Sequence, residues 1–92
     1  MPIGSINVAG YKQITATGNA SPNGGALVGI FVSAASVTPT ITVYDSATTT
    51  TTAKIIDTFI PVAGTWYQMG MGTANGIYVV ITGTVSATVA YI

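Results

Sequence analysis

Short runs of alternating apolar and polar residues, separated by turn residues, dominate this chain. The clearest run is 84–92, where Val85, Ala87 and Val89 alternate with threonine and serine. Alternation with a period of two is typical of a β-strand with one buried face. No segment sustains the apolar spacing of an amphipathic helix. The pattern predicts an all-β chain of about seven or eight short strands.

Turn residues set the expected ends of these strands. Glycine, proline, asparagine and serine cluster at 18–25, 34–39 and 70–76, which predicts connections there. The threonine-rich segment 46–53 predicts a polar hairpin tip. Thr82-Gly83 predicts a tight hairpin turn between the last two strands.

The length of 92 residues fits one small domain. Short strands that follow one another at this spacing favour a sandwich or a jelly roll. We therefore predict a compact antiparallel β-sandwich or jelly roll over residues 11–92. Residues 1–10 are expected to form an N-terminal arm or lead-in to this domain.

Two of the expected strands, 26–33 and 76–82, carry large apolar side chains in succession and would be apolar on both faces. An antiparallel sheet with one solvated face alternates instead. We expect a neighbouring subunit or another protein to cover the second face; the alternative is that loops or the arm fold over it. The candidate interface residues are Val28, Ile30, Trp66, Tyr67, Tyr78 and Val80, together with Ile3, Ile6 and Val8 of the arm.

Charged side chains make up only 4% of the chain, whereas about a quarter is usual. Two lysines balance two aspartates, and there is no arginine, glutamate, histidine or cysteine. A serine or threonine nucleophile would therefore lack a histidine base, and a thiolate zinc site is excluded. A nearly uncharged surface favours association. We predict no catalytic residue, no metal and no cofactor.

The two carboxylates do not form a catalytic pair in the expected strands. Asp45 ends one strand and Lys54 begins the next, which predicts a cross-strand ion pair between them. Asp57 lies three residues beyond Lys54, so we expect it on the opposite face and roughly 10 Å away from Asp45. General acid and base chemistry by paired carboxylates needs a shared cleft. The chain is therefore predicted not to be an enzyme.

Nucleic acid and membranes are not expected as partners. Two distant lysines do not make the basic cluster that phosphate binding needs. No apolar run approaches the ~20 residues of a membrane-spanning helix. The first residues lack the basic region and apolar core of a secretory signal.

Several strand segments carry a resemblance to known proteins. They are Pro39-Thr40-Ile41-Thr42-Val43-Tyr44-Asp45 and the segments 27–33, 55–61, 76–80 and 83–91. In these phrases the chain resembles small β proteins of tailed bacteriophages, which include capsid decoration (cement) proteins. The resemblance implies a compact β-sandwich or jelly roll, often trimeric, that is bound to the outside of the phage head and has no active site.

Resemblance and composition together predict a non-enzymatic virion protein. We expect a capsid decoration protein that is made in the host cytoplasm and lies on the outer capsid surface, with the major capsid protein and its own copies, as a homotrimer, as partners. One alternative is a tail-fibre or head-fibre module that recognises a host surface or glycan through Trp66 and Tyr67. Another is a structural β-module of the neck or tail.

Overall fold

The computed structural model describes residues 9–92, which form β-strands and no helix. The strands are β1 (Gly10–Ile14), β2 (Gly18–Ser21), β3 (Gly25–Tyr44), β4 (Lys54–Phe59), β5 (Thr65–Thr73) and β6 (Ile77–Tyr91). Many of their residues are valine, isoleucine or threonine, whose branched Cβ favours extended backbone. All strand pairs are antiparallel, so the predicted all-β antiparallel fold is confirmed. No described helix is long and apolar enough to cross a membrane.

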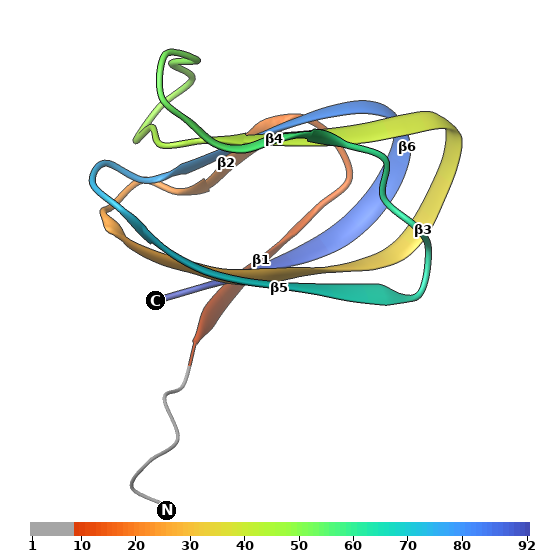
Figure 1. Cartoon of the computed structure of the whole chain (residues 1–92), viewed down its shortest axis with the longest axis horizontal. Helices are drawn as coiled ribbons and strands as arrows, with labels where there is room; N and C mark the ends of the chain where they lie inside the picture. The colour runs from red at the N-terminus through yellow and green to blue at the C-terminus, as the bar shows by residue number, and fades with distance from the viewer. Residues whose placement is uncertain (1–8) are drawn as a thin grey trace, which may run out of the picture.

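Two long strands, β3 and β6, organise the molecule. They pair with each other from Leu27 opposite Tyr91 at one end to Tyr44 opposite Tyr78 at the other. Both strands bend midway, so the pair folds back over itself and forms two layers (Figure 1).

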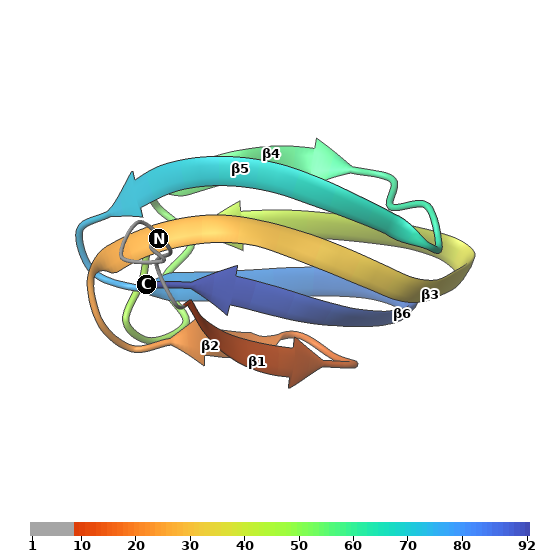
Figure 2. The ribbon, with the colours of Figure 1, turned by 90° about the horizontal axis from the view of Figure 1, so that it is seen from below.

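The bent pair divides the other strands between the two layers. In layer A, residues 25–36 of β3 and 84–91 of β6 are flanked by β5 and β1, so the strand order is β5-β3-β6-β1 (Figure 2). In layer B, residues 40–44 and 77–82 of the same two strands are flanked by β4 and β2. Each layer thus contains four strand segments, which is consistent with the predicted sandwich or jelly roll.

Left-handed backbone makes the bends between the layers. Val37 and Thr38 of β3 have φ angles of 60° and 51°, and Gly83 of β6 has a φ of 71°. A Cβ on Gly83 would lie 2.3 Å from the carbonyl oxygen of Val37, so only glycine fits there. The hairpin predicted at Thr82-Gly83 is wrong, because β6 continues through both residues into the other layer.

The strand count is six rather than seven or eight, because each bent strand occupies two predicted positions. The segment predicted as a loop at 18–25 contains β2, and β5 extends to Thr73 inside the glycine-rich segment predicted as a turn. Glycine at these positions therefore marks short or irregular strands as well as connections.

One apolar core fills the space between the layers. Its fully or nearly fully buried members are Ile14, Ala20, Leu27, Ile30, Val32, Ile41, Val43, Ile77, Val79, Val85, Ala87 and Val89. Leu27 and Ile30 are three residues apart, yet both face inward. The register shifts between Leu27 and Gly29, and this bulge adds one residue to β3 against β6. A single chain therefore buries some of the apolar residues of segment 26–33 in its own core, although the sequence predicted that a partner would cover them.

Candidate interaction surfaces

The residues predicted to meet a partner do not form one surface. Ile30 is fully buried, because the bulge at Val28 turns it into the core. Val28 itself is half-buried, while Trp66 exposes 46% of its surface. The arm residues Ile3, Ile6 and Val8 lie outside the described residues.

On the outer face of layer B, the side chains mainly contact one another. Tyr78 and Val80, both predicted interface residues, are half-buried there. The ring of Tyr78 packs against that of Tyr44 with centroids 6.3 Å apart. Thr42 is buried beside them, and its hydroxyl bonds the hydroxyl of Thr58 at 2.6 Å. This face leaves few unpaired groups for a partner.

The outer face of layer A is built differently, and its first row of side chains follows from the strand register. Trp66 of β5 lies opposite Phe31 of β3. Thr88 of β6 and Gln13 of β1 continue the row across the sheet. Phe31 and Trp66 expose 40% and 46% of their surfaces. Two large aromatic side chains therefore stand side by side at the surface.

A second row lies beside the first and contains Gln68, Gly29, Ala90 and Tyr11 in strand order. A Cβ on Gly29 would lie 2.5 Å from the indole ring of Trp66, so that ring lies over the glycine. Tyr11 exposes 73% of its surface at the far strand. We call this surface the aromatic face: Tyr11, Gln13, Phe31, Trp66, Gln68 and Thr88.

No charged side chain lies on the aromatic face. Lys12 pairs with the buried Val89 and so faces the inner side of β1. Asp45 follows the end of β3 in layer B, and Lys54 and Asp57 belong to β4. The face presents only aromatic, amide, hydroxyl and small apolar groups to solvent.

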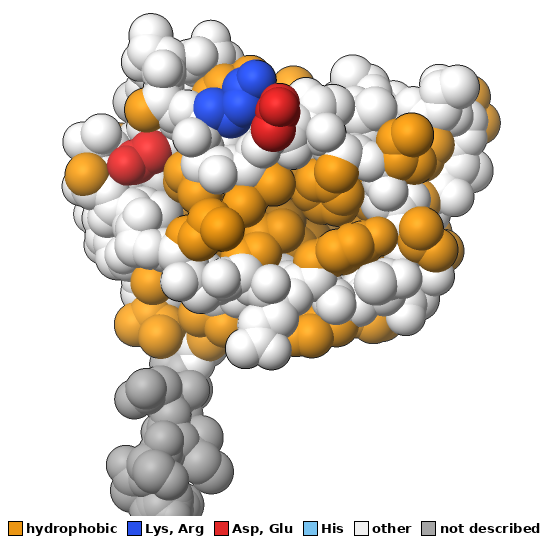
Figure 3. Space-filling model, viewed as in Figure 1, with side chains coloured by type: hydrophobic (Ala, Val, Ile, Leu, Met, Phe, Trp, Pro, Cys, Tyr) orange, Lys and Arg blue, Asp and Glu red, His pale blue; other side chains and the backbone are white. Residues whose placement is uncertain are grey.

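A different apolar surface lies where the two layers are open. Along β1 and β2 the core is covered by the buried Ile14, but along β4 and β5 the inward-facing apolar side chains are only half-buried. The space-filling view shows an apolar patch there, below the Lys54–Asp57 pair (Figure 3). We call it the edge patch: Ile56, Phe59, Tyr67 and Met69, with the exposed Ile60 and Val62 of the β4–β5 loop.

The edge patch is an ordered surface. The rings of Phe59 and Tyr67 pack across the opening with centroids 5.1 Å apart. The hydroxyl of Tyr67 accepts a hydrogen bond from the backbone N–H of Val62 at 2.9 Å, which fixes the loop. Tyr67 therefore points inward, while its neighbour Trp66 points outward. The fibre alternative expected these two residues to form one contact, but they belong to different surfaces.

The two edge strands differ in how well they are protected from pairing with another chain. β4 has two register shifts and carries the Lys54–Asp57 ion pair, and both features discourage strand addition. β5 is nine residues long and contains no charged residue or proline. Within residues 9–92, its bulge at Gly70, with a φ of 69°, is its only protection of this kind. Contact with another protein chain is therefore favoured along β5 and the edge patch.

The ion pair of β4 differs from the predicted one. Lys54 Nζ contacts Asp57 Oδ1 at 3.0 Å, and the residue opposite Lys54 is Tyr44 rather than Asp45. The register shifts of β4 break strict alternation, so residues 54 and 57 reach each other. This contact raises the pKa of Lys54 and lowers the pKa of Asp57. The predicted Asp45–Lys54 pair is therefore wrong.

Asp45 instead holds the turn between β5 and β6. Its carboxylate accepts hydrogen bonds from the backbone N–H groups of Ala74 at 2.9 Å, Asn75 at 2.7 Å and Gly76 at 3.2 Å. The bond from Ala74, followed by that from Asn75, lowers the pKa of Asp45 below its usual value. This carboxylate has a structural task that the sequence did not predict.

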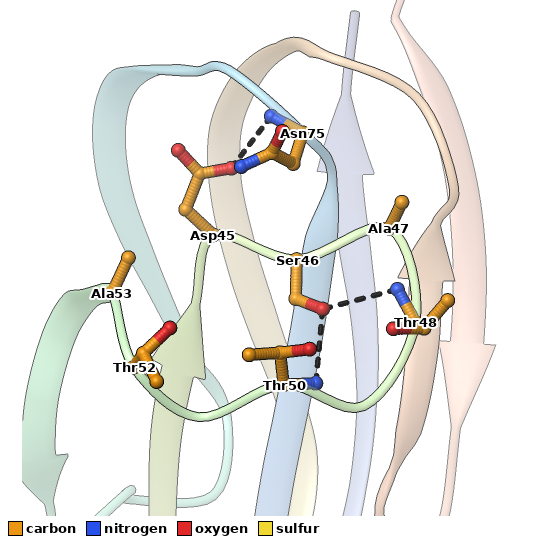
Figure 4. Close-up of a pocket in the computed structure, with 8 residues that line it drawn as sticks. All are labelled: Asp45, Ser46, Ala47, Thr48, Thr50, Thr52, Ala53 and Asn75. Atoms are coloured by element: carbon orange, nitrogen blue, oxygen red, sulfur yellow. Dashed lines mark hydrogen bonds between the residues drawn. The ribbon is translucent and has the colours of Figure 1, made fainter.

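The threonine-rich loop is held by side chains at its base. Ser46 Oγ accepts hydrogen bonds from the N–H groups of Thr48 and Thr50, both at 3.0 Å. The amide of Asn19 on β2 donates to the carbonyl oxygens of Ser46 and Thr48. A pocket lies inside the loop (Figure 4), lined by Asp45, Ser46, Ala47, Thr48, Thr50, Thr52, Ala53 and Asn75. Its one carboxylate is already engaged by the three N–H groups.

The described residues thus form two antiparallel β-layers with two different exposed apolar surfaces. Within residues 9–92, no three metal-ligating side chains come together, and Asp45 and Asp57 are held by separate partners. No protein-family model, curated protein or solved structure matches the chain.

Proposed function

We propose that this chain is a non-enzymatic structural protein of a bacteriophage particle, a capsid decoration protein that binds the outside of the head. The observation that carries the proposal is the edge patch. Between the edge strands β4 and β5, this patch extends the apolar core to the surface. A neighbouring molecule that covers the patch would bury apolar side chains that a single chain leaves partly exposed. Such burial contributes about 25 cal/mol per Å² of apolar area and needs no charge.

The proposed assembly is a homotrimer that also contacts the major capsid protein. In a closed ring of identical subunits, each copy meets two neighbours, so an apolar surface on every copy is covered. The exposed Ile60 and Val62, together with β5, whose bulge at Gly70 protects it only weakly, make this part of the chain suitable for such a contact. Light scattering of the purified protein should give three chain masses, whereas a stable monomer at micromolar concentration would contradict this assembly.

Binding to undecorated phage heads tests the function directly. Purified protein is mixed with the heads, which are then sedimented and imaged by electron microscopy, and ordered density between capsomers is the expected result. The double variant Ile60→Ser, Val62→Ser should lower occupancy by about tenfold or more, because it places hydroxyls in the apolar contact. The matched control is Val37→Ser, which changes an exposed valine at the bend.

Salt provides a second test of the same proposal. Since the attachment depends on apolar burial, molar sodium chloride should leave the protein on the heads. Release at moderate salt, or equal occupancy by the double variant and the wild type, would reject the edge patch as the apolar contact on which attachment to the heads depends.

A further inference from the structure

The aromatic face has the geometry of a stacking platform. Phe31 and Trp66 lie opposite each other on neighbouring strands, and Tyr11 lies on the strand at the other side of the same face. Gly29, which lies under the Trp66 ring, and Ala90 lie between them and add no large side chain to the middle of the face. Four adjacent strands span about 14 Å at the usual strand spacing. An extended ligand that crosses the strands would therefore meet aromatic rings near both of its ends.

Polar groups capable of two-way hydrogen bonding lie beside the rings. The side chains of Gln13 and Gln68 are exposed, and each offers one acceptor and two donors. Thr88 adds a hydroxyl between them. Aromatic rings stack on the C–H face of a pyranose ring, while amides and hydroxyls bind its hydroxyl groups. The face supplies both kinds of contact.

The charge distribution selects among possible occupants. All four charged side chains lie away from this face, so an anionic ligand would lose hydration there without gaining a cation. A neutral ligand pays no such cost. We propose that the aromatic face binds a neutral glycan chain of several pyranose rings, with Trp66, Phe31 and Tyr11 as the stacking residues.

This inference goes beyond the decoration function and does not depend on it. The edge patch is formed by inward-facing residues and the β4–β5 loop, whereas the glycan site is formed by outward-facing residues of layer A. A particle could therefore use one surface to attach the protein and present the other to a glycan-coated surface. Each site is tested by variants that leave the other unchanged.

Trp66 is the only tryptophan of the chain, so its fluorescence reports binding at this face directly. The purified full chain is titrated with cellohexaose and, separately, with chitohexaose, and affinity is measured in parallel by calorimetry. At least one hexasaccharide should shift the Trp66 emission and bind more tightly than glucose or N-acetylglucosamine.

Trp66→Ala and Tyr11→Ala should each weaken calorimetric binding by about tenfold or more. Val62→Ala, an exposed residue of the edge patch, is the matched control and should bind as the wild type does.

Four outcomes would overturn the proposal. One is that neither hexasaccharide changes the fluorescence or gives heat at millimolar concentration. Another is that Trp66→Ala and Tyr11→Ala, with unchanged circular dichroism, bind as tightly as the control. The third is that oligogalacturonate of the same length binds equally well. The fourth is that the emission shifts with protein concentration alone, which would make the face a contact between protein chains.

Discussion

The two layers of the sandwich share their long strands and their core but differ in their outer faces. Layer B pairs its outward side chains with one another, as in the Tyr44–Tyr78 ring contact and the Thr42–Thr58 hydrogen bond. Layer A leaves the Phe31 and Trp66 rings exposed and keeps charge away from them. Outward side chains that pack against or hydrogen-bond one another contribute to the stability of the fold. Large apolar side chains that stay exposed to solvent are available for contact with a ligand or partner. We therefore expect the outer face of layer B to contribute mainly to stability, and we propose that the outer face of layer A binds a ligand.

Core substitutions should affect both layers equally and should have the largest effect. Ile30→Ala in layer A and Ile41→Ala in layer B each remove a fully buried side chain, and each should lower the free energy of unfolding by about 2–5 kcal/mol. Urea denaturation followed by circular dichroism measures both. Phe31→Ala, on the outer face next to Ile30, should cost clearly less than either. An equal loss for Phe31→Ala would mean that layer A uses its outer aromatic side chains for stability.

Close packing at one turn of layer B provides the next prediction. A Cβ on Gly76 would lie 2.4 Å from the carbonyl oxygen of Ser21 and 2.6 Å from that of Ser46, so Gly76→Ala should cost about 1–3 kcal/mol or more. The matched change in layer A is Gly72→Ala, whose nearest contact is the carbonyl oxygen of Gly25 at 3.8 Å. It should change the urea midpoint little. If the two variants lose equal stability, the close contacts at Gly76 do not explain the loss of stability in Gly76→Ala.

Acid should weaken layer B through Asp45. Because its folded pKa is lowered, Asp45 contributes stability above its usual pKa of about 3.9, and this stability is lost as pH falls through the lower folded value. Urea midpoints measured between pH 2 and 7 should therefore fall below about pH 4. Asp45→Asn should flatten this fall more than Asp57→Asn, whose ion pair with Lys54 is exposed to solvent. A steeper fall in Asp45→Asn than in the wild type would refute the assignment.

The bend between the layers gives the smallest expected effect. Val37 is a β-branched residue with a φ of 60°, a conformation that asparagine adopts at lower cost. Val37→Asn should therefore raise the free energy of unfolding by up to about 1 kcal/mol. Ser36→Asn, one residue before the left-handed backbone, is the control and should have no comparable benefit. A loss of stability in Val37→Asn would show that the exposed valine makes a contact of its own.

Composition and alternation were sufficient to predict an antiparallel all-β fold. They did not predict how many strands there are, because a chain that bends between layers and a chain that reverses in a hairpin use similar residues. Gly83 shows this: glycine suits a left-handed turn in either case, and only the pairing of β6 with β3 on both sides of Gly83 identifies the bend.

The interface prediction had a similar limit. Strict alternation assigned Val28 and Ile30 to a common face, but the bulge in β3 sends Ile30 into the core. The aromatic face was missed except for Trp66, since Tyr11, Phe31 and Gln68 come from three strands whose register is not encoded locally. Exposed aromatic and amide residues in short strands were the available signal. Their meeting on one face depends on pairings between distant parts of the chain.

The continuity of β3 and β6 through both layers also affects how the molecule opens and forms. Because each strand belongs to both layers, neither layer can detach while the other stays intact, and their amide protons should exchange with solvent as one cooperative unit. The pairing of β3 with β6 brings Leu27 opposite Tyr91, which is near the other end of the described chain. Contacts between residues so far apart in sequence slow folding. We therefore expect the two outer faces to form together as the chain folds.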